Sequence, residues 1–128
     1  MRILLDTHAF LWWVTDDKRL SVRAKRLIAQ GSNEIFFSAA SAWEISIKST
    51  LGRIELPDAA ERYIPSQLEH NAFQPLPVRI EHALRVTALP SVHRDPFDRL
   101  LVAQALVEGL AILSKDRHFA SYPARVIW

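Results

Sequence analysis

Short, almost wholly apolar runs alternate with amphipathic segments along this chain. The first run covers residues 2–6 and stops at a carboxylate, Asp6. A strand with apolar residues at successive positions is typical of a parallel sheet, in which both faces of the strand are buried. The predicted strands are residues 2–6, 34–37, 110–114 and 125–127, the last at an edge, with an extended, proline-punctuated piece at residues 73–78.

Segments with a helical pattern lie between these runs. The predicted helices are residues 8–14, 22–28, 40–51, 80–89 and 96–108, with a further helix that starts near residue 58 and is interrupted by Pro65. The strongest local signal is at the last helix, where Asp95 occupies the N-cap, Pro96 the first helical position and Asp98 the third. The alternation predicts an α/β fold, a three-layer α/β/α arrangement around a parallel sheet of about four to five strands.

Composition narrows the function classes. The chain has 128 residues, of which 49% are hydrophobic, so we expect residues 1–128 to form a single domain. Cysteine is absent, which excludes disulfides, thiolate metal sites and cysteine nucleophiles and fits a reducing cytoplasm. The apolar stretch at residues 3–5 is too short for a signal peptide or a membrane span, so we expect a cytoplasmic protein without membrane association. The net charge of +2 says little about partners.

Four acidic residues that are distant in sequence are predicted to meet. Asp6 and Asp116 come just after the carboxyl ends of predicted strands, and Glu44 lies in the first turns of the helix that follows the second strand. The helix that carries Asp98 runs antiparallel to the strand that it precedes, so its N-terminus lies at the same edge. Sites in open parallel sheets form at this edge, because connecting loops and helix N-termini converge there.

Such crowded carboxylates repel one another, and buried charges without partners are costly. An all-oxygen cluster suits Mg²⁺ or Mn²⁺. Divalent metal at carboxylates favours phosphodiester hydrolysis, because the metal lowers the pKa of a bound water and neutralises charge on the phosphate. Basic residues that flank the acids and could hold neighbouring phosphates are Arg94, Arg99, Lys115 and Arg117.

Four segments in this order resemble the PIN domain family, and specifically its VapC-type toxins of bacterial type II toxin–antitoxin pairs. They are LLDTHAFLWW at residues 4–13, SAASAWEI at 38–45, DPFDRLLVAQA at 95–105 and LSKD at 113–116. The resemblance implies Mg²⁺-dependent endoribonuclease activity on an RNA substrate. It also implies a homodimer, a heterotetramer or larger assembly with a cognate antitoxin protein, and inhibition by that antitoxin at the acidic pocket.

The resemblance also assigns roles. Asp6, Glu44 and Asp116 match the family's first, second and last acidic positions. For the third position we choose Asp98, because it stands directly before the apolar helical stretch, and we keep Asp95 as a secondary contributor. Thr7 is expected to offer its hydroxyl to the water shell of the metal.

Each acid also has a purely structural interpretation. Glu44 precedes Lys48 by four residues, which favours a helix salt bridge worth about 0.3–0.5 kcal/mol. Turn or capping roles are open for the aspartates, Asp6, Asp95, Asp98 and Asp116. For Asp95 we favour capping, whereas for the other four acids we favour the metal site.

Three other features invite functional roles. His8 follows the first acid, but we interpret it as a packing or hydrogen-bonding residue rather than a ligand. The basic run of Lys18, Arg19, Arg23, Lys25 and Arg26 is interpreted as a solvated face, with RNA or antitoxin contact as the alternative. Trp12 and Trp13 are adjacent and diverge on a helix, so one of them is a candidate for an interface.

The leading hypothesis is therefore a metal-dependent endoribonuclease toxin. A catalytically silent PIN-like module that binds RNA or a protein is the alternative from another class. A phosphatase with an aspartyl nucleophile is disfavoured, because such enzymes place a second Asp where this chain has His8. The sequence identifies neither the RNA nor the antitoxin.

Overall fold

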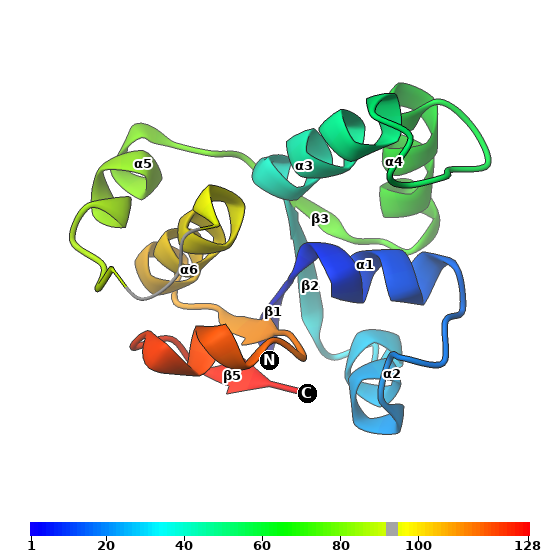
Figure 1. Ribbon diagram of the computed structural model, residues 1–128. Helices are drawn as coiled ribbons and strands as arrows, with labels where there is room; N and C mark the ends of the chain where they lie inside the picture. Colours follow the sequence, from blue (N-terminus) through cyan, green and yellow to red (C-terminus); the bar gives the residue numbers. More distant parts are fainter. Residues whose placement is uncertain (92–94) are drawn as a thin grey trace.

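The computed structural model, which describes residues 1–91 and 95–128, has one sheet of five strands in which every neighbouring pair is parallel (Figure 1). The strand order is β3-β2-β1-β4-β5. The strands are β1 (Arg2–Leu5), β2 (Glu34–Ser38), β3 (Gln74–Leu76), β4 (Ala111–Leu113) and β5 (Val126–Ile127). The predicted parallel sheet is confirmed, and the extended piece around residue 75 is its edge strand β3.

Helices cover both faces of this sheet and complete three layers (Figure 1). They are α1 (Thr7–Val14), α2 (Val22–Ala29), α3 (Ala39–Thr50), α4 (Ala60–His70), α5 (Ile80–Val86) and α6 (Pro96–Glu108), with a 3-10 helix η1 (Arg117–Ser121). The longest, α6, has 13 residues. Within the described part of the chain no helix has both the length and the apolar character that a membrane span requires.

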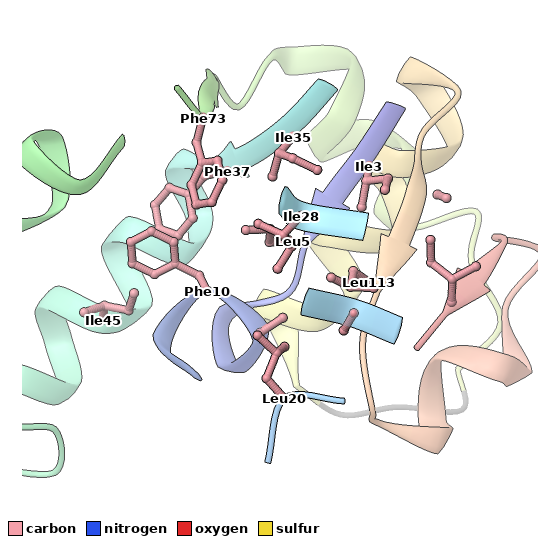
Figure 2. Packing of buried hydrophobic residues seen from close by; sticks show 14 of the residues in the cluster. Ile3, Leu5, Phe10, Leu20, Ile28, Ile35, Phe37, Ile45, Phe73 and Leu113 are labelled. Atoms are coloured by element: carbon pink, nitrogen blue, oxygen red, sulfur yellow. The ribbon is translucent and has the colours of Figure 1, made fainter. Parts of the chain in front are cut away.

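The two sides of the sheet hold separate hydrophobic cores, and β1 supplies both. Ile3 and Leu5 point into the core covered by α1 and α2, whereas Leu4 points into the core covered by α6. Figure 2 shows the first core, where the rings of Phe10 and Phe37 lie 4.2 Å apart between their centroids. Side chains alternate between the faces of a strand, so a continuous apolar run is required for β1 to serve both cores.

The strand order places a topological switch point at β1. From β1 the chain moves through α1 and α2 to β2 on one side, whereas β4 pairs with β1 on the other side. Loops leave the carboxyl ends of β1 and β4 in opposite directions, which opens a crevice between them. Asp6 and Ser114 stand at that crevice, directly after the last residues of these two strands.

Two predicted helix boundaries are wrong. Helix α4 continues through Pro65 instead of being interrupted there. Pro65 has no N–H to donate to the carbonyl of Glu61, so the helix loses one hydrogen bond. Because both residues are exposed, water can hydrate that carbonyl. The side chain of Ile64 is buried and anchors the helix. Helix α5 ends at Val86, shorter than predicted, and Thr87 is its C-cap.

The glycine that ends α6 has a left-handed backbone conformation whose cost for other residues can be measured. Gly109 has φ +68°, whereas Gly31 does not have a positive φ, and a Cβ added at either meets no atom within 4 Å. We therefore expect Gly109→Ala to lower the free energy of unfolding by about 1 kcal/mol through left-handed strain alone. Gly31→Ala, the matched control, should be neutral or slightly stabilising. Chemical denaturation measures both, and equal effects would contradict the interpretation.

Candidate functional site

Asp6 is held from three sides at the carboxyl end of β1. Its carboxylate caps α1 by accepting a 2.6 Å hydrogen bond from the backbone N–H of Ala9, and it also accepts a hydrogen bond from the hydroxyl of Ser114. Its own N–H donates to the carbonyl of Leu113 on β4 at 3.1 Å. The side chain is buried, and this burial raises the pKa of the Asp6 carboxyl. The first predicted acid is therefore fixed in a single orientation.

Glu44 is positioned from α1 and from its own helix. The Thr7 hydroxyl lies 2.7 Å from Glu44 Oε1 and 3.0 Å from the Ser41 hydroxyl. Lys48 Nζ lies 2.8 Å from Glu44 Oε2, so the salt bridge considered as an alternative is present. Glu44 is only 4% exposed, and Ser38 caps its helix, α3, by accepting from the N–H of Ala40. The carboxylate faces Thr7, the residue that follows Asp6.

Asp116 stands beyond β4 and is tied to Asp6 through Ser114. The Asp116 N–H donates to Ser114 Oγ at 3.0 Å, and the same hydroxyl donates to Asp6. Asp116 also caps η1, because its Oδ1 accepts from the N–H of His118 at 2.9 Å. Asp116 therefore caps η1 and also lies beside Asp6.

The pKa of Asp98 is affected by the charges of all the other acids. Burial, followed in order of size by the charges of Asp95, Glu44, Asp6 and Asp116, raises its pKa to about 8. Burial alone can raise the pKa of a carboxyl, but the contributions from the other four charges require that those carboxylates lie near Asp98. The structure thus brings the four predicted acids into one interacting group.

Asp95 is a helix cap, as favoured from the sequence. Its Oδ1 accepts hydrogen bonds from the backbone N–H groups of Phe97 at 2.8 Å and Asp98 at 3.3 Å. It also contributes to the raised pKa of Asp98, so it lies at the margin of the acidic group. Pro96 occupies the first turn of α6, and Gly109 ends the helix in the left-handed conformation, both as predicted.

The donors of this group are carboxylate and hydroxyl oxygens, which are the ligands that Mg²⁺ and Mn²⁺ prefer. In the described residues, no three of these acids bring ligand atoms within 4.8 Å of one another. Mg²⁺ commonly binds through one or two carboxylates and keeps several waters, so the wider spacing suits it. The residues present therefore fit a hydrated divalent ion.

Two hollows adjoin the acids. The smaller, about 280 Å³, is lined by Asp6, Asp116, Lys115, His8 and Trp12. A larger cavity of about 670 Å³ shares His8 and Trp12 with it, and its cationic lining residues are Arg19, Lys48 and Arg53. The larger cavity is also lined by Asp17 and Glu55, so its charges are of both signs, and it meets the acidic group through Lys48, which pairs with Glu44.

A second set of potential metal ligands lies elsewhere. Glu81, His82 and Glu108 bring their ligand atoms within 4.8 Å of one another on α5 and α6. His82 accepts from the N–H of Arg79 at Nδ1, so its Nε2 carries the hydrogen that it shares with Glu108 at 2.8 Å. The Nδ1 bond closes the start of α5, whereas the Nε2 bond joins α5 to Glu108 on α6. Glu108 is ten residues from Asp98 along α6, about 15 Å, so this set is separate from the acidic group.

The basic residues that flank the acids in the sequence have different surroundings in the structure. Arg99 donates to the carbonyls of Pro90 and Val86, so it holds the end of α5 instead of facing the acids. Lys115 lies 6.0 Å from the centre of the Trp12 ring and lines the smaller hollow. Arg117 is exposed, whereas Arg94 lies outside the described residues.

The remaining sequence features are mostly structural. In the basic run, Arg19 pairs with Asp17 at 2.7 Å, and Lys25 lies 3.8 Å from Asp16. Trp13 is partly buried and donates its indole N–H to Asn71. Trp12, also partly buried, contacts Trp128 and Arg19. His8 is exposed beside Trp12, with 5.7 Å between ring centres.

Sequence reasoning missed two serines. Ser114 connects Asp6 with Asp116, and Ser41 contacts Thr7. Ser114 and Ser41 are both almost fully buried. Polar residues directly after an apolar strand, or on the buried face of a helix, are the signal that could have identified them.

Comparisons with known proteins agree with this arrangement. A sequence model of the PIN domain family matches residues 3–124. This chain belongs to the PIN domain family, in its VapC-type group. Ribonuclease VapC22 of Mycobacterium tuberculosis is 31% identical over 121 residues, which cover 94% of this chain and 91% of that protein.

Solved PIN-domain structures share the fold at low identity. VapBC2 from Rickettsia felis, bound to a DNA fragment from its promoter, has a TM-score of 0.74 at 13% identity, covering 99% of this chain and 98% of that one. DNA-bound VapBC from Salmonella typhimurium has a TM-score of 0.70 at 16% identity, covering 99% and 97%. These likenesses confirm the three-layer architecture.

The acidic group predicts an unusual pH dependence of stability. The pKa of Asp98 rises from 3.8 to about 8 on folding. Between these pH values the folded chain keeps a proton that the unfolded chain has released. The contribution of Asp98 therefore lowers the free energy of unfolding progressively as the pH rises from about 4 to about 8. In EDTA, Asp98→Asn should therefore be more stable than the wild type at pH 8, with the gain disappearing near pH 4.

The control for this measurement is Asp17→Asn. The pKa of half-buried Asp17 is lowered to about 2 by its hydrogen bonds with Arg19, so both folded and unfolded states are already ionised above about pH 5. Its effect should be constant between about pH 5 and pH 8 in thermal unfolding. A gain for Asp98→Asn that did not change with pH would contradict the electrostatic account.

Proposed function

We propose that this chain is a Mg²⁺-dependent endoribonuclease, with Mn²⁺ as a substitute, that acts as the toxin of a toxin–antitoxin pair. The observation that carries the proposal is the convergence of Asp6, Glu44, Asp98 and Asp116 on one interacting group that lines an open hollow. The similarity to ribonuclease VapC22 supports RNA as the substrate class.

The metal would be held by Asp6, Glu44, Asp98 and Asp116, with Thr7 in its water shell and Asp95 at the margin. When bound, it supplies a water of lowered pKa and positive charge beside the scissile phosphate. The chain's own residues prepare this place. Ser114 and the N–H of Ala9 hold the Asp6 carboxylate, and Thr7 holds that of Glu44.

Lys48 is proposed to balance charge in the free protein and to face the substrate in the complex. It lies 2.8 Å from Glu44 and its side chain is 33% exposed at the larger cavity. An ammonium at this place favours entry of a phosphate backbone that the acids alone would repel. The acidic group and its cationic neighbour would then receive one phosphodiester between them.

We further propose the biological setting. The similar structures are VapBC complexes, which supports a cognate antitoxin that covers the acidic pocket and an assembly of a heterotetramer or larger built on a homodimer. We also propose that residues 1–128 work as one PIN domain in the cytoplasm. Inhibition by a partner fits a nuclease whose active group opens to the surface.

The decisive test is RNA cleavage by the wild type and by Asp6→Asn. We expect cleavage that requires Mg²⁺ or Mn²⁺, and a loss of at least about a hundredfold in the variant, because the carboxylate at the centre of the group is removed. Asparagine is also a good N-cap, so α1 should keep its cap and the variant its fold, as circular dichroism would verify.

Asp58→Asn, at an exposed acid that precedes α4 and pairs with Arg62, is the matched control and should cleave normally. Metal-independent cleavage, or full activity in a folded Asp6→Asn protein, would overturn the proposal. RNA binding that persists without cleavage and without the carboxylates would favour the catalytically silent module.

A further inference from the structure

One aromatic side chain next to the acids is left open to solvent. Trp43 is 64% exposed, and in the described part of the chain it is the one aromatic residue among the exposed large hydrophobic side chains. Its neighbour in sequence, Glu44, is 4% exposed. A single exposed hydrophobic side chain is common, but an indole that directly precedes an acid of the candidate site is a position that a ligand could cover.

An aromatic residue directly precedes an acid on each of two helices, α3 and α6. On α3 it precedes Glu44, and on α6 Phe97 precedes Asp98. The Trp43 and Phe97 rings contact each other edge to face, with 5.4 Å between centroids and 73° between planes. The charges of Glu44 and Asp98 also interact. The two rings therefore contact each other at the positions that directly precede the two acids on their helices.

The surroundings of Trp43 suit a single flat ligand better than a protein helix. A docked helix needs apolar residues at three- and four-residue spacing along a face. Around Trp43 these positions are held by Ala39, exposed Ser46 and partly buried Ile47. The next exposed large apolar residue, Leu51, is the C-cap of α3, eight residues away or about 12 Å. Aromatic side chains of this kind stack on unpaired nucleobases.

We propose that Trp43, supported by Phe97, is a stacking platform for an unpaired nucleobase next to the scissile phosphate. This inference rests on the proposed ribonuclease function and deepens it by naming the side chain that would hold the nucleotide beside the cleavage site. Stacking is tolerant of base identity, so the platform positions the RNA without selecting a sequence. Trp43 touches the substrate base in this proposal, and Phe97 positions Trp43.

The test uses the RNA that the wild type cleaves, as a short single-stranded oligonucleotide with Mg²⁺. Trp43→Ala should lower kcat/KM on the order of tenfold, because one base-stacking contact is lost. Trp43→Phe should restore most of it. A series with one abasic nucleotide at each position should contain one position where the wild type loses a similar factor and Trp43→Ala loses nothing more.

Leu51→Ala is the matched control, because Leu51, the C-cap residue of α3, is 60% exposed and lies eight residues beyond Trp43. It should cleave like the wild type. Thermal unfolding should show that the Trp43 variants are as stable as the wild type, so that lost folding does not explain lost cleavage.

The outcomes separate this inference from the function on which it rests. A wild type that cleaves no RNA overturns both. A wild type that cleaves while Trp43→Ala cleaves equally well overturns the platform alone, as does additivity at every abasic position. Unchanged cleavage with weakened binding to the antitoxin or to a second copy of the chain would assign Trp43 to a protein interface and overturn the platform.

Discussion

Repulsion among buried carboxylates is the interaction around which this structure is arranged. Asp98 has a pKa of about 8 because it is buried near four other acids, and burial also raises the pKa of Asp6. A fold gains nothing in stability from such a group, because each charge lowers the ionisation of the next. The arrangement is understandable where a cation completes it, which is why the acidic group supports the proposed metal site more strongly than any acid alone.

The acids are also structural residues, and the two roles reinforce each other. Asp6, Asp95 and Asp116 each cap a helix with one carboxylate oxygen. A cap holds its side chain in a fixed orientation, which leaves the second oxygen in a defined place. The capping and site interpretations, which compete when the sequence is considered alone, are therefore compatible in the folded protein. Glu44 behaves in the same way, because one oxygen meets Thr7 and the other meets Lys48.

The sheet order explains why the acids can meet. Strands β1 and β4 are neighbours although more than a hundred residues separate them, and the crevice between their carboxyl ends receives Asp6 and Ser114. Helices α3 and α6 bring Glu44 and Asp98 to the same edge, and with them Trp43 and Phe97. One topological feature thus positions the acids and the aromatic pair together.

Local patterns in the sequence determined most elements of this fold. The apolar runs predicted the central strands, and Asp95, Pro96 and Gly109 predicted both ends of α6, because caps and buried strands depend on a few neighbouring residues. Placing the acids on one edge of a parallel sheet also followed from the alternation of strands and helices. The PIN resemblance added the VapC-type group, which the comparisons bear out.

Only the tertiary structure decided the rest. Pro65 is tolerated because it lies on an exposed face of α4, which no local pattern specifies. The Ser114 bridge and the contact between Trp43 and Phe97 join residues that are distant in the chain. Such contacts depend on strand order and helix packing, and those are set by the burial of two complete hydrophobic cores and not by any short segment.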